Sequence, residues 1–167
     1  MSNKISHKLK SAIYPGTFDP ITFGHLDVIE RSAELFDFIT IAIAIGSSKK
    51  TLFTVDERIQ MIKQSTKKFK NVSVKSFKGL MVDYACSEKA DAVIRGLRAI
   101  SDFEYEFQMA LTNRRIAENI TTVFLMPNEK YTYLNSTLVR EIASYGGDVS
   151  PFVPPHVLKK LKEKFKK

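Results

Sequence analysis

Apolar residues along this chain gather in short runs, separated by longer stretches with helical spacing. Strands are predicted at residues 12–14, 38–45, 72–77, 92–94 and 122–126, because these runs are short and rich in β-branched side chains. The run 38–45 hardly alternates between apolar and polar residues, which is typical of a strand buried on both faces. The run 72–77 does alternate, which indicates a strand with one polar face.

Helices are predicted in the stretches between these strands. They are expected over 25–36, from 54 to about 68, over 80–89, over 103–118, from 135 to the glycine pair at 146–147, and from 155 onward. Thr54 and Glu57 have the spacing of a capping box, in which each side chain accepts a hydrogen bond from the other residue's backbone N–H. Gly146 is a typical helix stop, and Pro155 is a typical start.

This alternation of strands and helices predicts one α/β domain over residues 1–167. We expect a Rossmann-like doubly wound sheet, mostly parallel and five-stranded, with an N-terminal extension at 1–10 and a basic C-terminal helix at 155–167. In such sheets ligands bind beyond the carboxyl ends of the strands. The loops of interest therefore follow residues 14, 45, 77, 94 and 126.

The composition, with 44% hydrophobic residues, is that of a globular protein with a core of useful size. Cys86 is the one cysteine, so an internal disulfide is excluded, and its apolar surroundings predict a small core residue rather than a nucleophile. The N-terminus has no secretory pattern, and the longest apolar run is too short to span a bilayer. A cytoplasmic protein without a membrane partner is expected.

The net charge of +8 is concentrated in lysines at 4–10, 63–70 and 159–167. Lysine runs of this kind are most often solvated helix faces. A basic nucleic-acid-binding module is an alternative, but these lysines lack interleaved aromatic residues and no known binding motif accompanies them. We therefore expect no nucleic-acid partner.

The loop after Tyr14 carries the first candidate chemistry. It runs Tyr14-Pro-Gly-Thr-Phe-Asp-Pro-Ile-Thr-Phe-Gly-His25 and leads into a predicted helix. The free amides and the dipole at a helix N-terminus favour an anion, and Gly24 lets a ligand approach the backbone closely. His25 lies at the same point and can donate to a phosphate oxygen. The alternative is that His25 only caps the helix.

Three more loops at the same edge carry cations or a helix start. Lys49 follows the second strand, and Arg95 and Arg98 flank Gly96 after the fourth, an arrangement that suits bidentate phosphate binding. The segment 135–137 opens a helix and is either an ordinary cap or a second phosphate cradle. Each signal is modest by itself, and their convergence on one edge of the sheet indicates a phosphate site.

Several other site classes are excluded by what the sequence lacks. The first strand is not followed by Gly-x-Gly-x-x-Gly, and there is no Walker lysine motif and no nucleophile elbow. The three histidines, His7, His25 and His156, are far apart and form no metal-binding pattern. We therefore expect no protein-held metal site, no dinucleotide redox site, no P-loop and no serine hydrolase.

The segment Thr22-Phe-Gly-His25 resembles the T/H-x-G-H signature of the nucleotidyltransferase superfamily. The chain is similar in particular to the bacterial phosphopantetheine adenylyltransferases, from about residue 10 to near the C-terminus. The similar stretches are 14–22, Ser-Ser-Lys-Lys at 47–50, Arg-Gly-Leu-Arg-Ala-Ile-Ser-Asp-Phe-Glu-Tyr-Glu at 95–106 and Asn-Ser-Thr-Leu-Val-Arg-Glu at 135–141. The chain departs from this family at Phe23, where Asn is usual, and at Asn135, where a serine is common.

The resemblance implies transfer of an adenylyl group from ATP to 4′-phosphopantetheine, giving dephospho-coenzyme A and pyrophosphate. It implies catalytic roles for His25, Thr17 and Lys49. It implies phosphopantetheine binding by Thr17, Lys49, Met81 and Arg95. It implies ATP binding by Thr17, Phe18, His25, Gly96, Leu97, Arg98, Glu106, Tyr131, Thr132, Tyr133, Leu134, Asn135, Ser136 and Thr137.

The resemblance also implies Mg²⁺ bound mainly through the ATP phosphates, coenzyme A as a feedback ligand, and a homohexamer built as a dimer of trimers. An alternative within the superfamily is an enzyme that acts on another phosphorylated acceptor, such as nicotinamide mononucleotide. The block 95–106 favours phosphopantetheine over that acceptor.

Overall fold

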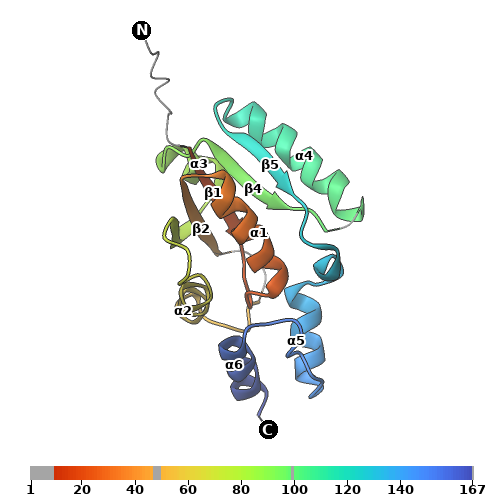
Figure 1. Cartoon of the computed structure of the whole chain (residues 1–167). Coiled ribbons are helices and arrows are strands. Elements are labelled where there is room, and N and C mark those ends of the chain that lie inside the picture. Colours follow the sequence, from red (N-terminus) through yellow and green to blue (C-terminus); the bar gives the residue numbers. More distant parts are fainter. Residues whose placement is uncertain (1–9, 47–49, 99, 167) are drawn as a thin grey trace.

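The computed structural model of the chain describes residues 10–46, 50–98 and 100–166, and contains a single five-stranded sheet (Figure 1). The strands are β1 (Ser11–Gly16), β2 (Phe38–Ile45), β3 (Val72–Lys78), β4 (Ala92–Gly96) and β5 (Thr121–Leu125). Their order is β3-β2-β1-β4-β5, and every neighbouring pair is parallel. The predicted Rossmann-like doubly wound fold is confirmed, with a sheet that is wholly rather than mostly parallel.

The helices begin and end close to their sequence signals. They are α1 (Phe23–Leu35), α2 (Val55–Ser65), α3 (Met81–Ser87), α4 (Ile100–Ile116), α5 (Ser136–Ser144) and α6 (Pro155–Phe165), with a 3₁₀ turn η1 at Glu129–Tyr131. Thr54 and Glu57 form the predicted capping box of α2. Asn135 caps α5 by accepting the N–H of Leu138 at 2.8 Å.

Alternate residues of the strands feed two separate hydrophobic cores, one on each face of the sheet. On β1, Ala12 and Tyr14 belong to the first core with Val28 of α1, whereas Ile13 points into the second core with Val82 of α3. Because successive strand side chains point to opposite faces, helices cover both sides of the sheet (Figure 1). This explains why the run 38–45 is apolar almost throughout.

The chain order reverses between the neighbouring strands β1 and β4. From β1 the chain moves outward through β2 to β3, then crosses back to β4 and continues to β5. In sheets of this type such a reversal opens a crevice beyond the carboxyl ends of the two strands. Gly16 ends β1 and Gly96 ends β4, so the two loops with the strongest sequence signals meet at this crevice.

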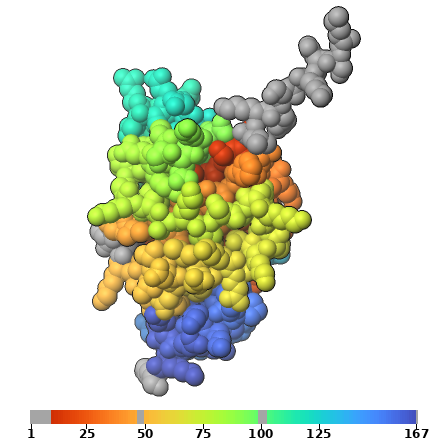
Figure 2. Space-filling model, turned by 90° about the vertical axis from the view of Figure 1, so that its left-hand side faces the viewer, coloured from red at the N-terminus to blue at the C-terminus, as the bar shows by residue number. Residues whose placement is uncertain are grey.

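The basic helix α6 packs Val157 and Leu161 into the first core and leaves its lysines exposed. It lies at one end of the molecule, beside the surface formed by α2 (Figure 2). Lys164 pairs with Glu57 of α2 at 2.9 Å, and Lys160 pairs with Glu163 at 3.0 Å. These contacts are those of a solvated helix face. Among the described residues, no helix is long and apolar enough to cross a membrane.

The prediction for Cys86 is wrong, because its side chain is exposed rather than part of a core. The buried residues of α3 are Val82 and Ala85, which are three positions apart and share a face. Cys86 is the next residue after Ala85 and lies about 100° further around the helix, on the solvent side. The apolar stretch indicated burial of the segment but did not indicate which face is buried.

Candidate active site

The loop after β1 takes a tight, left-handed course around Phe18. Phe18 has a φ of 49°, in a region that non-glycine residues seldom occupy, and its side chain is buried. Its ring meets the rings of Tyr14 and His25 edge to face, at centroid distances of 5.4 and 5.1 Å. A Cβ on Gly16 would lie 2.9 Å from the Phe18 ring, so this position requires glycine.

His25 caps α1 and also lines the spaces at the crevice, so its capping role leaves the predicted role in ligand binding open. Thr22 and His25 form a capping box: the N–H of Thr22 donates to Nδ1 of His25 at 3.1 Å, and the N–H of His25 donates to the Thr22 hydroxyl. Since Nδ1 accepts hydrogen bonds, the proton of the neutral ring is on Nε2. Burial, together with the charge of Arg98, lowers the pKa of His25 to about 4. The ring is therefore a neutral donor with a fixed orientation.

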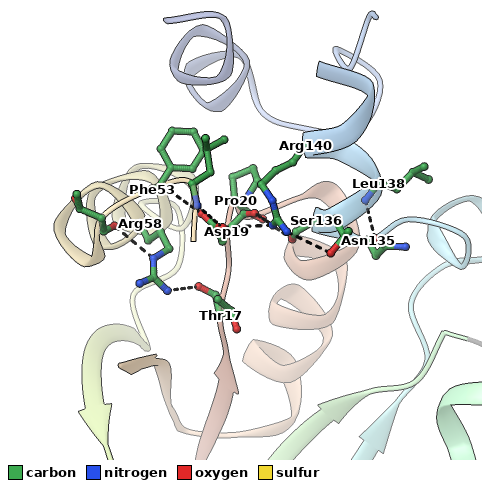
Figure 3. Close-up of polar contacts among 12 residues, drawn as sticks. Thr17, Asp19, Pro20, Phe53, Arg58, Asn135, Ser136, Leu138 and Arg140 are labelled. Atoms are coloured by element: carbon green, nitrogen blue, oxygen red, sulfur yellow. Dashed lines mark hydrogen bonds and ion pairs between the residues drawn. The ribbon is translucent and has the colours of Figure 1, made fainter. Parts of the chain in front are cut away.

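Asp19 fastens three segments of the chain together at the edge of the crevice (Figure 3). Its side chain is 2% exposed, and its carboxylate accepts the backbone N–H groups of Leu52 and Phe53 at 2.8 and 2.9 Å. Arg140 of α5 pairs with the same carboxylate at 3.4 Å and also donates to the Asp19 carbonyl. The hydroxyl of Ser136 donates to the Pro20 carbonyl at 2.7 Å. The first loop, the segment before α2 and the start of α5 are thereby held in one arrangement.

Arg58 of α2 also holds the loop that follows β1. The residue is 3% exposed, and its guanidinium donates to the carbonyls of Thr17 at 2.8 Å and Thr54 at 3.3 Å (Figure 3). Burial lowers the pKa of Arg58, and the nearby charge of Asp19 opposes that shift. A buried cation that donates to two backbone carbonyls serves the structure of the loop. Arg58 lies three and four residues before the buried Met61 and Ile62, so helical spacing places it on the same face of α2.

A cavity of about 500 Å³ lies between the ends of β1 and β4 and the helices α3 and α4. We call it the apolar cavity; its lining includes Phe77, Leu80, Met81, Tyr105, Met109 and Ile116. In its lining, Arg95 and Glu106 form a bidentate ion pair, with Nε to Oε2 at 2.7 Å. Although burial opposes it, the hydrogen bond and charge of Glu106 raise the pKa of Arg95. Thr17 and His25 also line this cavity.

His25 also lines two smaller spaces. The cationic hollow, of about 210 Å³, is lined by Thr17, Phe18, Asp19, His25, Lys50, Thr51, Arg98, Ser136 and Arg140. The narrow cleft, of about 80 Å³, is lined by Tyr14, Thr22, Gly24, His25, Val28, Gly96, Arg98, Pro127, Tyr131 and Leu134. Arg98 borders both spaces and donates to the Leu134 carbonyl at 3.3 Å.

Thr17 and His25 are shared by the apolar cavity and the cationic hollow. A ligand with an apolar arm and an anionic end can therefore meet a polyanion at these two side chains. Hydroxyl and imidazole donors at such a junction suit phosphoryl oxygens. Within the described part of the chain, no three His, Cys, Asp or Glu side chains come together in a way that could hold a metal ion.

The structure brings most of the predicted site residues to these three spaces. Phe18, Gly96, Arg98, Glu106, Tyr131, Leu134, Ser136, Met81 and Arg95 line at least one of them. Thr137 contacts Arg140, Thr132 donates to the Glu129 carbonyl, and the exposed Tyr133 packs against Phe152. The N–H of Leu97 donates to Leu125. Lys49 lies outside the described residues.

Sequence reasoning did not assign a role to Asp19, Arg58 or Arg140. Asp19 is within the first motif, between Phe18 and Pro20. A polar residue in a loop predicted to bind phosphate could have been recognised as a candidate site residue. Arg140 is one helical turn after Ser136, which places it beside the same hollow. For Arg58 the signal is its spacing, because it precedes Met61 and Ile62 by three and four residues and so lies on the apolar face of the helix.

Residues 13–142 match the sequence model of the cytidylyltransferase-like family. The chain is 55% identical, over 95% of its length and 99% of the relative, to a phosphopantetheine adenylyltransferase of Thermodesulfovibrio yellowstonii. It is 53% identical, over 94% of its length and 98% of the relative, to one of Opitutus terrae. A similar relative in Caldanaerobacter subterraneus is 52% identical, with 95% of this chain and 99% of the relative covered.

The fold is shared with a crystal structure from Vibrio parahaemolyticus of a provisionally named nicotinate-nucleotide adenylyltransferase. The TM-score is 0.70, and the match covers 96% of this chain and 98% of the other, at 21% sequence identity. At that identity the likeness bears on the fold alone.

Proposed function

The chain belongs to the phosphopantetheine adenylyltransferase family of cytidylyltransferase-like proteins, and on that basis we propose that it transfers the adenylyl group of ATP to 4′-phosphopantetheine. The products are dephospho-coenzyme A and pyrophosphate, and the reaction is the penultimate step of coenzyme A biosynthesis. The observation that carries the proposal is the shared position of Thr17 and His25 between an apolar cavity and a cationic hollow.

The two substrates are assigned to the two sides of this junction. The pantetheine arm occupies the apolar cavity, with Met81 in its lining and Arg95 beside the phosphate. ATP lies along the narrow cleft and the cationic hollow, with its phosphates toward Arg98 and Ser136. Support comes from size and charge, since about 500 Å³ accommodates a flexible organic chain and the hollow carries cationic side chains.

The remaining assignments follow the family. Lys49 orients the acceptor phosphate. Phe18, Gly96, Leu97, Glu106 and the segment from Tyr131 to Thr137 bind ATP. Glu106 departs from this division, because it lines the apolar cavity and pairs with Arg95 there.

Catalysis rests on positioning and on electrostatic stabilisation. The acceptor phosphate is already an anion, so it needs no base and no covalent intermediate. The barrier lies in bringing two polyanions together and in the charge that builds at the α-phosphorus. His25 Nε2–H and the Thr17 hydroxyl donate to the transferring oxygens. Arg58 holds Thr17 in place through its carbonyl, and the capping box with Thr22 holds the imidazole.

Mg²⁺ is proposed to reach the site bound to the ATP phosphates and water. The side chains of the hollow fit this arrangement, because Asp19, its one carboxylate, is engaged by the N–H groups of Leu52 and Phe53 and by Arg140. Such a donor set offers no protein cage, which is usual for Mg²⁺ in phosphate-transfer sites. The ion would neutralise charge on the β- and γ-phosphates.

We also propose a homohexamer, built as a dimer of trimers, a cytoplasmic location and feedback by coenzyme A. The oligomer is supported by apolar side chains of α4 that a single chain leaves exposed, including Phe103, Phe107 and Leu111. Light scattering of the purified protein tests the assembled state. Competition of coenzyme A with 4′-phosphopantetheine tests the feedback ligand.

The deciding experiment measures pyrophosphate release from MgATP with 4′-phosphopantetheine, with nicotinamide mononucleotide, and without acceptor. Release only with 4′-phosphopantetheine, with dephospho-coenzyme A identified by mass, is expected. Release with nicotinamide mononucleotide alone would assign a different acceptor. No release with either acceptor would overturn the proposal.

A further inference from the structure

Phe23, within the segment Thr22-Phe-Gly-His25, lies directly behind a wall of the narrow cleft. It is the first residue of α1, and its backbone N–H donates to the Phe152 carbonyl at 2.9 Å. Its ring stacks on that of Tyr131, with centroids 6.3 Å apart and planes inclined by 26°. Tyr131 lines the narrow cleft, whereas Phe23 does not. Phe23 therefore contacts Tyr131 but does not itself line the narrow cleft.

Tyr131 separates two spaces. On one side is the narrow cleft, and on the other is an outer hollow whose lining includes Phe23, Leu26, Lys68 and Phe69. Phe23 thus backs Tyr131 from the outer side. Gly24 brings the helix close as well, since a Cβ at this position would lie 3.6 Å from the Tyr131 Cβ.

The segment around Tyr131 is held to the rest of the fold by both backbone and side-chain contacts. The N–H of Asn128 donates to the carboxylate of Asp27 at 2.9 Å, and Arg98 donates to the Leu134 carbonyl at 3.3 Å. Both contacts lie at the ends of the segment and use its backbone. Among its side chains, Leu134 is buried in the first core and Tyr133 packs against Phe152. The stack on Phe23 acts on Tyr131 itself, which lines the cleft.

We propose that Phe23 is a positioning residue for nucleotide binding: its ring holds Tyr131, and with it the segment 128–134, in the arrangement that ATP binds. This inference rests on the proposed function only in assigning ATP to the narrow cleft. Ligand binding costs less conformational entropy when the residues that contact the ligand are already ordered. When the competent arrangement is populated only in part, the apparent dissociation constant rises by the reciprocal of that fraction.

The size of the effect follows from one aromatic pair. Losing such a pair lowers the population of the held arrangement, and the dissociation constant for ATP rises by about two- to tenfold. Phe23 is not among the described residues that line the apolar cavity or the cationic hollow, which meet at Thr17 and His25, so turnover at saturation is unchanged. Acceptor binding in the apolar cavity is also unchanged, because neither Phe23 nor Tyr131 lines it.

Three variants test the proposal. Phe23→Leu removes the ring and keeps an apolar side chain, and Phe23→Tyr keeps the ring. Phe69→Leu is the matched control, because Phe69 lines the same outer hollow but its ring contacts Lys68. MgATP is titrated calorimetrically into each variant without acceptor. KM for each substrate, kcat and Tm are then measured.

Phe23→Leu is expected to raise the ATP dissociation constant and the ATP KM in the same proportion, with kcat and the acceptor KM within twofold of the parent. Phe23→Tyr and Phe69→Leu are expected to match the parent. Unchanged or tighter ATP binding in Phe23→Leu overturns the proposal. An equal rise in both KM values, or an equal effect of Phe69→Leu, also overturns it, because general loosening would then be the cause.

A double variant keeps the test decisive if Phe23→Leu is poorly folded. Tyr131→Leu removes the other ring of the pair, so adding Phe23→Leu to it should weaken ATP binding no further. Additive losses would contradict the stack. The titrations need no acceptor, so they remain informative if the parent fails to use 4′-phosphopantetheine, which would count against the proposed function alone.

Discussion

Replacing Asp19 with alanine removes the acceptor on which the loop arrangement around the crevice depends. The change leaves the N–H groups of Leu52 and Phe53 without their partner and deletes the ion pair with Arg140. The Phe53 N–H is buried, whereas the Leu52 N–H is part-buried and can recover water. The variant should therefore lose structure first in the segment before α2.

The expected loss of stability follows from these partners. A buried donor left unsatisfied costs about 1–3 kcal/mol, and a hydrogen bond to a charged group contributes about 1.5–3 kcal/mol. With one buried and one part-buried N–H, we expect Asp19→Ala to lower the free energy of unfolding by about 3 kcal/mol. Asp19→Asn keeps one acceptor oxygen and should lose about half as much.

Urea unfolding at neutral pH measures this difference through the midpoint, provided that the m-value is unchanged. Asp148→Ala is the matched control, because Asp148 also accepts a backbone N–H, that of Ser150 at 2.9 Å, but is exposed to water. The control should cost less than about 1 kcal/mol. A loss for Asp19→Ala no larger than that of Asp148→Ala would refute the reasoning.

Three further outcomes are expected at the reacting centre. With its pKa near 4, His25 stays neutral above pH 6, so the plot of kcat against pH should show no change of slope near pH 6.5. A change of slope there that His25→Gln removes would contradict the assigned protonation state. His25→Ala should lower kcat by about 10²–10³-fold while calorimetry shows that ATP still binds, and an unchanged kcat would remove the donor role. Lys49→Ala should mainly raise the acceptor KM, and normal acceptor kinetics in that variant would exclude Lys49 from the site.

The fold and most of the crevice could be predicted because their signals are local. The capping box of Thr54 and Glu57 lies within one helical turn, and each strand is marked by its own apolar run. A parallel sheet then brings the carboxyl ends of its strands to one edge, so Thr17, Arg95 and Arg98 could be grouped before any coordinates were known.

The sequence by itself determined the order of elements, the parallel sheet and the edge where the candidate site residues collect. Only the tertiary structure decided how the polar groups at that edge are paired. Asp19 finds its backbone partners 33 and 34 residues away, and Glu106 takes the guanidinium of Arg95. The ring of Phe23 stacks on Tyr131, which lies in another segment of the chain. Periodicity reports which face of an element is apolar, whereas partners brought together by folding leave no spacing in the chain.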